Sequence, residues 1–288
     1  MSGELTIMDG GMGGELIRRG WPSGGLWSAK ALLEKPEVVR AVHEDYINAG
    51  AQVIITNSYS TVPSYLAKEN MESRYVELTS IAARLAREVA DAAAADVKVA
   101  GCVPPLSESY RPDLVPADDQ ARPIYAEIVK ALSTDVDLYV CETMSSVREA
   151  VNAASSVRLT DPDKPLWVAL TLADQPGGGL RSGEGMEQVV AALEPFAVDA
   201  FLFNCTDPSA ISVALEELMP LTDTAIGAYP NRFHVPPGWT LDNEIKTEPT
   251  ELSVAQYLEF VATWRRSGAS IIGGCCGVGP EFIAALSA

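Results

Sequence analysis

The protein has 288 residues, of which 47% are hydrophobic and 21% are charged, an ordinary globular composition with enough apolar side chains for a sizeable core. Its 21 basic and 39 acidic side chains give a formal net charge of −18, which argues against a protein that binds nucleic acid or anionic lipid. The N-terminal segment lacks the basic and apolar stretches of a signal peptide, and no run approaches the roughly 18 apolar residues of a membrane span.

Short apolar runs alternate along the chain with helical patterns. Several runs, such as VIIT, LYVC and AFLF, are almost wholly apolar, which is typical of parallel strands buried on both faces. In chain order we expect strands at 5–9, 53–58, 97–103, 138–143, 166–172, 200–205, 225–229 and 269–273. We expect helices at 36–48, 71–95, 125–134, 147–157, 185–196, 209–218, 253–266 and 281–286.

This alternation of about eight strand–helix pairs predicts a closed (β/α)8 barrel of the TIM type, and we expect residues 1–288 to form a single domain of this kind. The alternative is an open, doubly wound parallel sheet, which is expected to carry a glycine fingerprint at the start of a helix. The glycines within 10–14 follow the first predicted strand, but their spacing does not match that fingerprint. The sequence therefore favours the barrel.

Catalytic side chains of such a barrel lie where its strands end. No lysine closes a predicted strand, which argues against a Schiff-base aldolase, and two histidines, His43 and His234, are too few for a binuclear hydrolase. The remaining candidates are cysteines: Cys205 ends the sixth predicted strand, and Cys275 and Cys276 follow the eighth. Three thiolates and one open position form a catalytic zinc site, so these cysteines are the candidate catalytic and metal-ligating residues.

The adjacent pair needs an irregular backbone to serve one ion. Neighbouring residues on a regular strand point to opposite faces, so Cys275 and Cys276 can share a metal only where the strand has broken, and flanking glycines allow that. The alternative is that cysteines are small buried hydrophobes, and we assign Cys102 and Cys141 to such packing. Five cysteines, an odd number, predict reduced thiols in a cytoplasmic protein rather than a secreted disulfide framework.

Polar side chains also close several predicted strands. A carboxylate at the end of an apolar strand is costly to bury unless it is paired, so Glu142 predicts a cationic partner, either on a ligand or on an arginine. Asp9 precedes two glycines, where it could serve a ligand or fix the turn. Asn204 and Asn231 could hydrogen-bond a ligand or the loops around it.

Together these residues resemble the zinc-dependent homocysteine S-methyltransferases, a family of (β/α)8 barrels. The resemblance covers nearly the whole length of the chain. It rests on DGGMGGEL at 9–16, on the segment at 26–59 that ends in TNSY, on CET at 141–143, on FNC at 203–205, on YPN at 229–231 and on GGCCGVGPEFI at 273–283.

The resemblance implies a role for each of these motifs. It implies that Cys205, Cys275 and Cys276 hold zinc and that Glu142 binds the ammonium group of the acceptor. It also implies that the amino-acid pocket is lined by the turn after the first strand, formed by Asp9, Gly10 and Gly11. One stretch departs from the family: many members read something like GSVGP after the third strand, whereas this chain has GCVPPLSESYRPD at 101–113, beside the expected site.

The implied activity is methyl transfer to the thiol of L-homocysteine, which gives methionine. A thiolate displaces a methyl group readily from a sulfonium or quaternary ammonium because the leaving group departs neutral, so S-methylmethionine, S-adenosylmethionine and betaine are candidate donors. A cationic donor suits an acidic protein. Aromatic rings could offer such a donor a π face, with core or loop packing as the alternative for each of Tyr59, Trp27, Trp239 and Phe233.

Two alternative functions remain open. A methyltransferase of the same kind could act on another thiol or on a selenol such as selenocysteine, and a non-enzymatic zinc-thiolate protein would leave Glu142 without a role. The expected partners are small molecules, without nucleic acid or membrane, and the sequence does not determine the oligomeric state. The proline-containing segment 232–249 and the glycine-rich segment 175–185 are expected to be loops at the same rim, the first as part of a donor pocket or lid.

Overall fold

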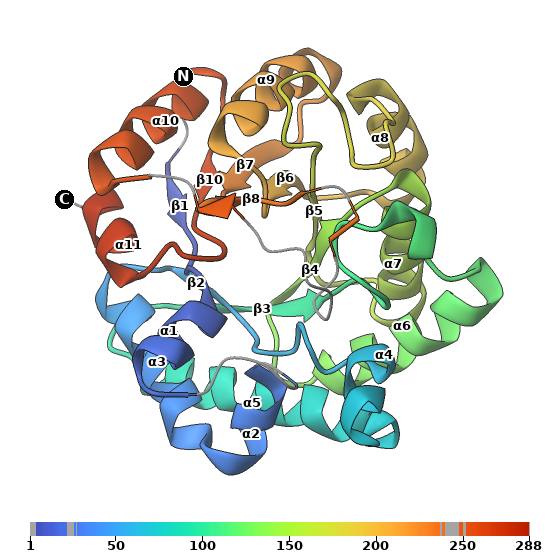
Figure 1. Ribbon diagram of the computed structural model, residues 1–288, viewed down its shortest axis with the longest axis vertical. Coiled ribbons are helices and arrows are strands. Elements are labelled where there is room, and N and C mark those ends of the chain that lie inside the picture. The colour runs from blue at the N-terminus through green and yellow to red at the C-terminus, as the bar shows by residue number, and fades with distance from the viewer. Residues whose placement is uncertain are drawn as a thin grey trace.

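The computed structural model describes residues 4–21, 26, 28–236, 238–239, 248–249 and 252–287. Eight of its strands pair in parallel in one sheet, which forms a ring when viewed end-on (Figure 1). Their spatial order is β1 (Thr6–Ile7), β10 (Ile271–Ile272), β7 (Ala225–Tyr229), β6 (Ala200–Asn204), β5 (Leu166–Leu170), β4 (Leu138–Met144), β3 (Lys98–Val103) and β2 (Val53–Ile55). Between β1 and β2, Gln52 N donates to Ile7 O (2.7 Å) and Asp9 N donates to Val53 O (2.9 Å). These bonds close the ring, so the predicted (β/α)8 barrel is confirmed.

Helices cover the outside of the ring (Figure 1). They are α1 (Met12–Arg18), α2 (Ser28–Glu34), α3 (Pro36–Asn48), α4 (Pro63–Leu66), α5 (Tyr75–Ala92), α6 (Asp118–Leu132), α7 (Val147–Thr160), α8 (Met186–Leu193), α9 (Pro208–Leu218), α10 (Val254–Arg266) and α11 (Pro280–Leu286). Short 3-10 turns are η1 (Ala67–Glu69), η2 (Glu72–Arg74), η3 (Pro112–Leu114), η4 (Glu194–Phe196) and η5 (Met219–Leu221).

Local sequence explains several helix starts. Proline occupies the first turn of α3, α4, α9 and α11, where its missing N–H costs no hydrogen bond. Ser146 caps α7 by accepting a hydrogen bond from Glu149 N, and Ser253 and Gln256 form a capping box at the start of α10. These caps fix where each helix leaves the loop that follows a barrel strand.

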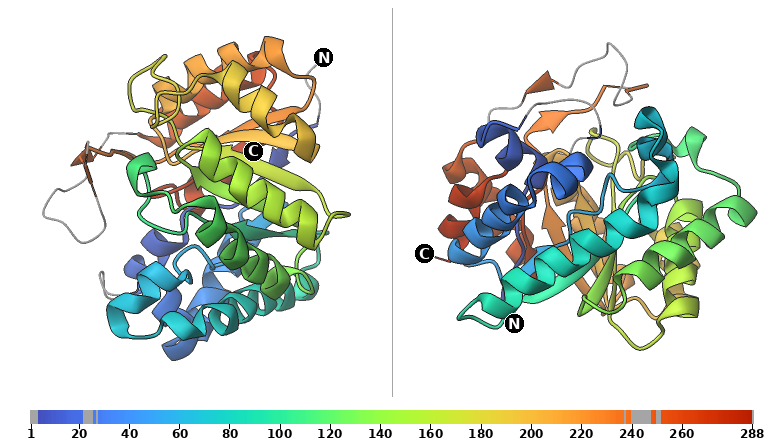
Figure 2. Two further views of the ribbon diagram at one scale, coloured as in Figure 1. Left: turned by 90° about the vertical axis from the view of Figure 1, so that its right-hand side faces the viewer. Right: turned by 90° about the horizontal axis from the view of Figure 1, so that it is seen from below.

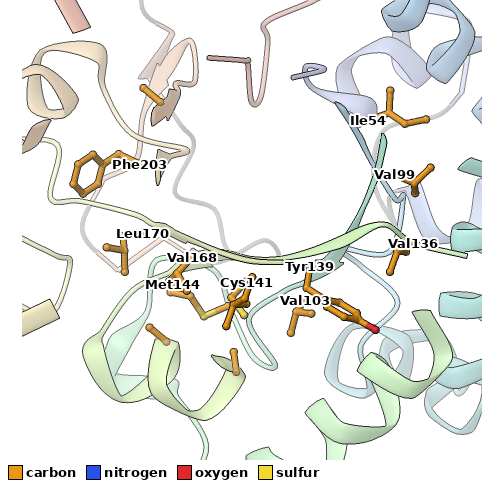
Figure 3. Packing of buried hydrophobic residues seen from close by; sticks show 14 of the residues in the cluster. Ile54, Val99, Val103, Val136, Tyr139, Cys141, Met144, Val168, Leu170 and Phe203 are labelled. Atoms are coloured by element: carbon orange, nitrogen blue, oxygen red, sulfur yellow. The ribbon is translucent and has the colours of Figure 1, made fainter. Parts of the chain in front are cut away.

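Alternating side chains of the strands build two apolar layers. The inner layer fills the barrel and consists of Met8, Val53, Ala100, Leu138, Val140, Ala169, Ala200, Leu202, Tyr229 and Ile271. The outer layer lies between ring and helices and includes Tyr139, Cys141 and Met144 of β4 (Figure 3). Cys141 therefore packs toward the helices, as expected, and its neighbour Glu142 faces the inside of the barrel.

Some elements differ from the expectations. Helix α6 begins at Asp118 rather than at residue 125 and contains Pro123. Ala121 and Tyr125 are buried on either side of this proline, so tertiary packing outweighs its usual cost inside a helix. Helices α1, α2 and α4, of seven, seven and four residues, were not predicted; segments this short display little of a helical period.

The segment 232–249 is partly regular, which corrects the expectation of an irregular loop. In it, β8 (Phe233–His234) and β9 (Glu248–Pro249) pair antiparallel and form a small ribbon at one end of the barrel (Figure 2). Most of the chain between β8 and β9 lies outside the described residues, as does Trp27. None of the helices that the structure describes has the length and apolar character needed to cross a membrane.

Candidate metal centre and acceptor pocket

Three thiols from distant parts of the chain meet at the carboxyl ends of the strands. Cys275 Sγ lies 3.1 Å from Cys205 Sγ, and Cys276 Sγ lies 4.0 Å from both. These separations exceed the roughly 2.05 Å of a disulfide, and all three cysteines are free. Within the described ranges, this is the group of at least three cysteine, histidine or acidic residues whose ligand atoms lie close enough to share one ion.

The triangle of sulfurs suits a tetrahedral metal ion. Sulfur atoms at about 2.3 Å from a tetrahedral zinc ion are about 3.8 Å apart. The two separations of 4.0 Å are close to this value, and the third, 3.1 Å, is shorter. Hydrogen bonds from the Cys205 and Cys275 thiols hold the pKa of the Cys276 thiol well below its usual range, so the cluster already favours a thiolate. Three soft sulfur ligands could therefore hold a metal ion and leave one position for an incoming ligand.

Cys275 and Cys276 reach the same site because β10 ends before them and the chain turns. Gly277 has a φ of +80°, a left-handed conformation that a side chain would oppose. Arg232 holds this turn: its backbone N–H donates to Cys276 O (3.0 Å), and its guanidinium donates to Gly277 O (3.3 Å). The same guanidinium lies 5.0 Å from the centre of the Phe282 ring, which fixes its direction.

Gly10 and Gly11 bring the first strand against the cysteine turn. A side-chain carbon on Gly10 would lie 2.3 Å from Val278 O, and one on Gly11 would lie 2.7 Å from Cys275 O. Gly11 N also donates a hydrogen bond to Val278 O (3.0 Å). These glycines are therefore needed for close backbone contact, and any contact they make with a ligand would use their backbone atoms.

Glu142 lies on the inner face of β4, buried and without a basic partner among the described residues. Its Oε2 accepts a hydrogen bond from the Cys102 thiol (3.1 Å). Burial raises its pKa to about 7, and the nearby Cys205 adds to that rise, whereas the bond from Cys102 opposes it. The arginine ion pair considered as an alternative is not seen, and the carboxyl is left available for a cationic group.

Cys102 does more than the packing role assigned to it. Its thiol is fully buried and contacts the candidate ammonium site through Glu142 Oε2. The alternation of side chains along β3 could have predicted this position. Cys102 follows the inward-facing Ala100 by two residues and so points into the barrel.

Asp9 lies buried close to Glu142 and joins two strands. Its Oδ2 accepts a hydrogen bond from Ile55 N (2.8 Å), which ties the end of β1 to the end of β2. Burial holds the pKa of Asp9 well above its usual range, and the charge of Glu142 adds to the rise. Asp9 thus fixes the strand end and supplies a second acidic group to the same pocket.

Two residues at the end of β7 have buried polar atoms without partners. The Tyr229 hydroxyl makes no hydrogen bond with good geometry, although burial and the nearby charge of Glu142 raise its pKa. Neither amide atom of Asn231 makes a hydrogen bond, and the residue is fully buried. Buried polar groups are rarely left unpaired, so these atoms mark positions that a ligand can complete. Sequence analysis selected Asn231 and missed Tyr229, two residues earlier in the same motif.

Asn204 is engaged with the chain itself. Its Oδ1 accepts from Thr143 N (3.1 Å), and its Nδ2 donates to Thr143 Oγ1 (2.8 Å). These two bonds join the end of β6 to the end of β4, and the amide keeps one further N–H that a ligand could use. Thr143 directly follows Glu142, so Asn204 acts on the pocket by holding that strand end.

Backbone strain is concentrated around this pocket. Thr143, Cys205 and Tyr110 have φ angles of 60°, 51° and 65°, in the left-handed region that residues with side chains rarely adopt. Among the described non-glycine residues, Asn70 and Ala197 are the other two with positive φ. Such strain persists where the surrounding structure holds it in place, and it is frequent at functional sites.

Aromatic side chains border the sulfur cluster. The hydroxyl of Tyr59 lies 2.7 Å from Ser109 Oγ, so only its half-buried ring could face a donor. Burial raises the pKa of Tyr59, and the nearby Cys205 adds to that rise. Trp239 packs edge-on against Tyr110, with ring centres 5.5 Å apart, and Phe233 is half-buried in β8.

Tyr110 was missed by sequence analysis. Its hydroxyl lies 2.8 Å from Cys205 Sγ, in contact with a candidate metal ligand. The sequence feature that could have identified Tyr110 is its position within segment 101–113, where the chain departs from the family pattern.

Comparisons with known proteins identify the family of the chain. A family model described as homocysteine S-methyltransferase matches residues 6–288. The homocysteine S-methyltransferase of Escherichia coli strain K12 is 33% identical over 302 residues, covering 99% of this chain and 95% of its own length. The homocysteine S-methyltransferase YbgG of Bacillus subtilis strain 168 is 31% identical over 307 residues, covering 99% and 94%. A selenocysteine methyltransferase of Astragalus bisulcatus is 28% identical over 320 residues, covering 98% and 91%.

Solved structures give the same result. The crystal structure of the homocysteine methyltransferase MmuM from Escherichia coli in its metallated form matches with a TM-score of 0.82 at 30% identity, covering 99% of this chain and 96% of that one. Its oxidized form matches with a TM-score of 0.83. The match of the family model over nearly the whole chain, together with these relatives, shows that the chain belongs to the homocysteine S-methyltransferase family.

Proposed function

We propose that this protein transfers a methyl group from an onium donor to the thiol of L-homocysteine, giving methionine. The proposal rests on the triangle of Cys205, Cys275 and Cys276 beside the buried Glu142, which has no basic partner among the residues that the structure describes. A site for a thiol next to a site for an ammonium group matches the two ends of this amino acid. The names of the Escherichia coli and Bacillus subtilis relatives support the same acceptor.

We further propose that the metal is zinc, held by the three cysteines. Zinc bound there would deprotonate the acceptor thiol and hold its sulfur at the open fourth position. Three cysteine thiolates require a reducing environment, which supports a cytoplasmic location. The chain acts in this proposal as one barrel domain.

The acceptor's amino-acid part is gripped by the inner rim. Ionised Glu142 pairs with the ammonium group, and the charge pair in turn lowers the pKa of that carboxyl. The Tyr229 hydroxyl, which lies beside Glu142, and the Asn231 amide, which makes no hydrogen bond to the described residues, supply hydrogen bonds to the remaining polar atoms of the ligand. Asp9 keeps β1 and β2 together below the pocket. Holding the amino-acid part at these points aims the sulfur at the donor.

The transfer step needs no general acid from the chain. The acceptor sulfur forms a bond to the methyl carbon while the bond from that carbon to the donor's sulfonium sulfur breaks, and its electron pair stays on the departing sulfur. The donor leaves as a neutral thioether. S-methylmethionine and S-adenosylmethionine are the proposed donors, and the aromatic rings of Tyr59 and Trp239 are candidates for contact with the positive charge.

The test is a donor panel. Zinc-loaded protein is incubated with L-homocysteine and, in turn, S-methylmethionine, S-adenosylmethionine and betaine, and methionine is measured. We expect methionine with at least one sulfonium donor and none when homocysteine is omitted. Absence of acceptor-dependent methionine with every donor would support the non-enzymatic zinc-thiolate protein instead.

A second acceptor is favoured by one observation, the similarity to the selenocysteine methyltransferase of Astragalus bisulcatus. A selenol carries the same amino-acid groups on a comparable side chain, so the Glu142 pocket would accept it. An assay in which homocysteine and selenocysteine compete for a limiting donor distinguishes the two acceptors. We expect kcat/KM to be larger for homocysteine than for selenocysteine. The reverse order would identify selenocysteine as the preferred acceptor.

A further inference from the structure

Tyr110 contacts the sulfur cluster from outside the acceptor pocket. It follows β3 in segment 101–113, and its hydroxyl oxygen lies 2.8 Å from Cys205 Sγ. Both residues have left-handed backbone conformations, with φ of 65° and 51°. Two strained residues in hydrogen-bond contact indicate that their relative position is held by other parts of the structure.

Contacts to the Tyr110 ring provide that restraint. The guanidinium of Arg181 lies 4.8 Å from the ring centre, and Trp239 packs edge-on against the same ring at 5.5 Å between centres and 64° between planes. A ring held on its face and its edge cannot swing, so the hydroxyl stays directed at Cys205.

Arg181 is itself fixed by an ion pair that is mostly buried. Its Nη2 lies 3.1 Å from Asp174 Oδ1, with 10% and 12% of the two side chains exposed. Asp174 Oδ2 also accepts a hydrogen bond from Val235 N (2.9 Å), just after β8. The loops after β5 and β7 therefore converge on Tyr110 in the loop after β3, and each contributes one contact that holds its ring.

We propose that Tyr110 is a positioning residue for Cys205, donating a hydrogen bond from its hydroxyl to the Cys205 sulfur under the restraint of Arg181. Once the cysteine is a thiolate it has no proton to give, so the phenol is the donor. The bond fixes the direction of the sulfur despite the strained backbone and offsets part of the negative charge of the three-thiolate set. The inference rests on the proposed function only in that the cysteines hold a metal.

The closing experiment measures metal binding directly. Zinc affinity is determined by competition with a chelator for the wild-type protein and for Tyr110→Phe, which keeps the ring and loses the hydroxyl. We expect affinity to fall about tenfold to a hundredfold, as for other hydrogen-bond partners of metal ligands. Cobalt(II) replaces zinc in a parallel sample, and the thiolate-to-cobalt charge-transfer band should shift, which a purely structural role would not cause.

Tyr139→Phe is the matched control. Its hydroxyl donates a hydrogen bond to Asp161 Oδ2 (2.8 Å) on the helix side of β4, so the same chemical change occurs away from the sulfurs. We expect unchanged zinc affinity and an unchanged cobalt band for this variant. Thermal unfolding of each variant checks that the fold persists.

A double-mutant cycle tests the part played by Arg181. Arg181→Met should weaken zinc binding in the wild-type background and have no further effect in the Tyr110→Phe background. Unchanged affinity and an unchanged band in Tyr110→Phe would overturn the inference even if the wild type is active. A wild type that binds zinc but makes no methionine would overturn the proposed function and leave the inference standing. A wild type that binds no zinc would overturn both.

Discussion

Glutamate and cysteine side chains are buried in two regions of the protein, the outer layer and the mouth of the barrel, and their surroundings differ between the two. In the outer layer, Glu149 at the start of α7 accepts hydrogen bonds from Ser145 N and Oγ, both at 2.7 Å, and Cys141 packs among apolar side chains. At the mouth of the barrel, Glu142 accepts one bond from a thiol, and Cys205 sits in a strained conformation among other sulfurs. Burial raises the pKa of both glutamates to about 7.

This comparison shows that burial and a raised pKa do not by themselves identify a site. The glutamate of the outer layer has its hydrogen bonds supplied by the chain, whereas the mouth combines unpaired polar atoms, strained backbone and ligand-type sulfurs within one pocket. A structural residue is satisfied by its neighbours, and a functional one is completed by a ligand.

The largest effect should come from the cysteines. Cys205→Ala removes one of the three proposed metal ligands, so we expect zinc content to fall and methyl transfer to drop at least about a thousandfold. Cys141→Ala, the matched change in the outer layer, should keep zinc and turnover and lower the free energy of unfolding by about 1 kcal/mol. Metal analysis, kcat/KM and chemical denaturation check both variants. Full activity of a metal-free Cys205→Ala protein would remove the distinction between the two regions.

The two glutamates provide the next contrast. Glu142→Gln removes the charge that pairs with the acceptor's ammonium, so KM for homocysteine should rise about a hundredfold. Glu149→Gln keeps an oxygen that can accept from Ser145, so KM should stay the same and unfolding should become easier by about 1 kcal/mol. Equal effects of the two variants on KM would mean that Glu142 has no special role at the mouth.

The pH dependence of acceptor use sharpens this contrast. Glu142 must be ionised to pair with an ammonium, and its pKa is raised to about 7 by burial. In the wild type, kcat/KM for homocysteine should therefore fall by up to about tenfold for each pH unit below 7. Because Glu142→Gln cannot titrate there, its profile should be flatter over the same range. Superimposable profiles would show that the carboxyl does not control acceptor binding.

His43 also lies in the outer layer, but unlike Glu149 its polar atoms make no hydrogen bonds to the described residues. Of the changes proposed here, its substitution should have the smallest effect on function. His43 is fully buried in α3 with neither ring nitrogen hydrogen-bonded, and burial lowers its pKa to about 4. It is neutral when folded and takes up a proton when unfolded below pH 6.5. Stability should therefore be unaffected above that pH and fall by up to about 3 kcal/mol as the pH drops from 6.5 through 4.

Denaturant unfolding of wild type and His43→Met across this pH range measures the effect. The variant should lose less stability on acidification, while both proteins keep the same KM for homocysteine at pH 7.5. Parallel pH curves would show that other groups cause the acid sensitivity. A changed KM would place His43 in the site, contrary to its position in the outer layer.

The sequence carried much of the site as well as the fold. Alternating apolar runs and helical periods predicted the barrel, and the strand ends supplied Cys205, Cys275, Cys276 and Glu142. Side-chain contacts between different strands and loops were beyond such patterns: Tyr110 and Tyr229 were not selected, and Asn204 could not be assigned to Thr143. These contacts depend on how strand ends and loops converge, which no local period encodes.

Chain order and residue type by themselves predicted the barrel, the three cysteines that meet at its mouth and the buried acid, because strand period and strand ends are local properties of the sequence. The tertiary structure alone decided which groups are satisfied and which are left open. It turned Cys102 toward Glu142, engaged Asn204 with Thr143 and left the Asn231 amide without a hydrogen bond among the described residues. The reason is that hydrogen-bond satisfaction depends on distances between elements that only meet once the ring has closed.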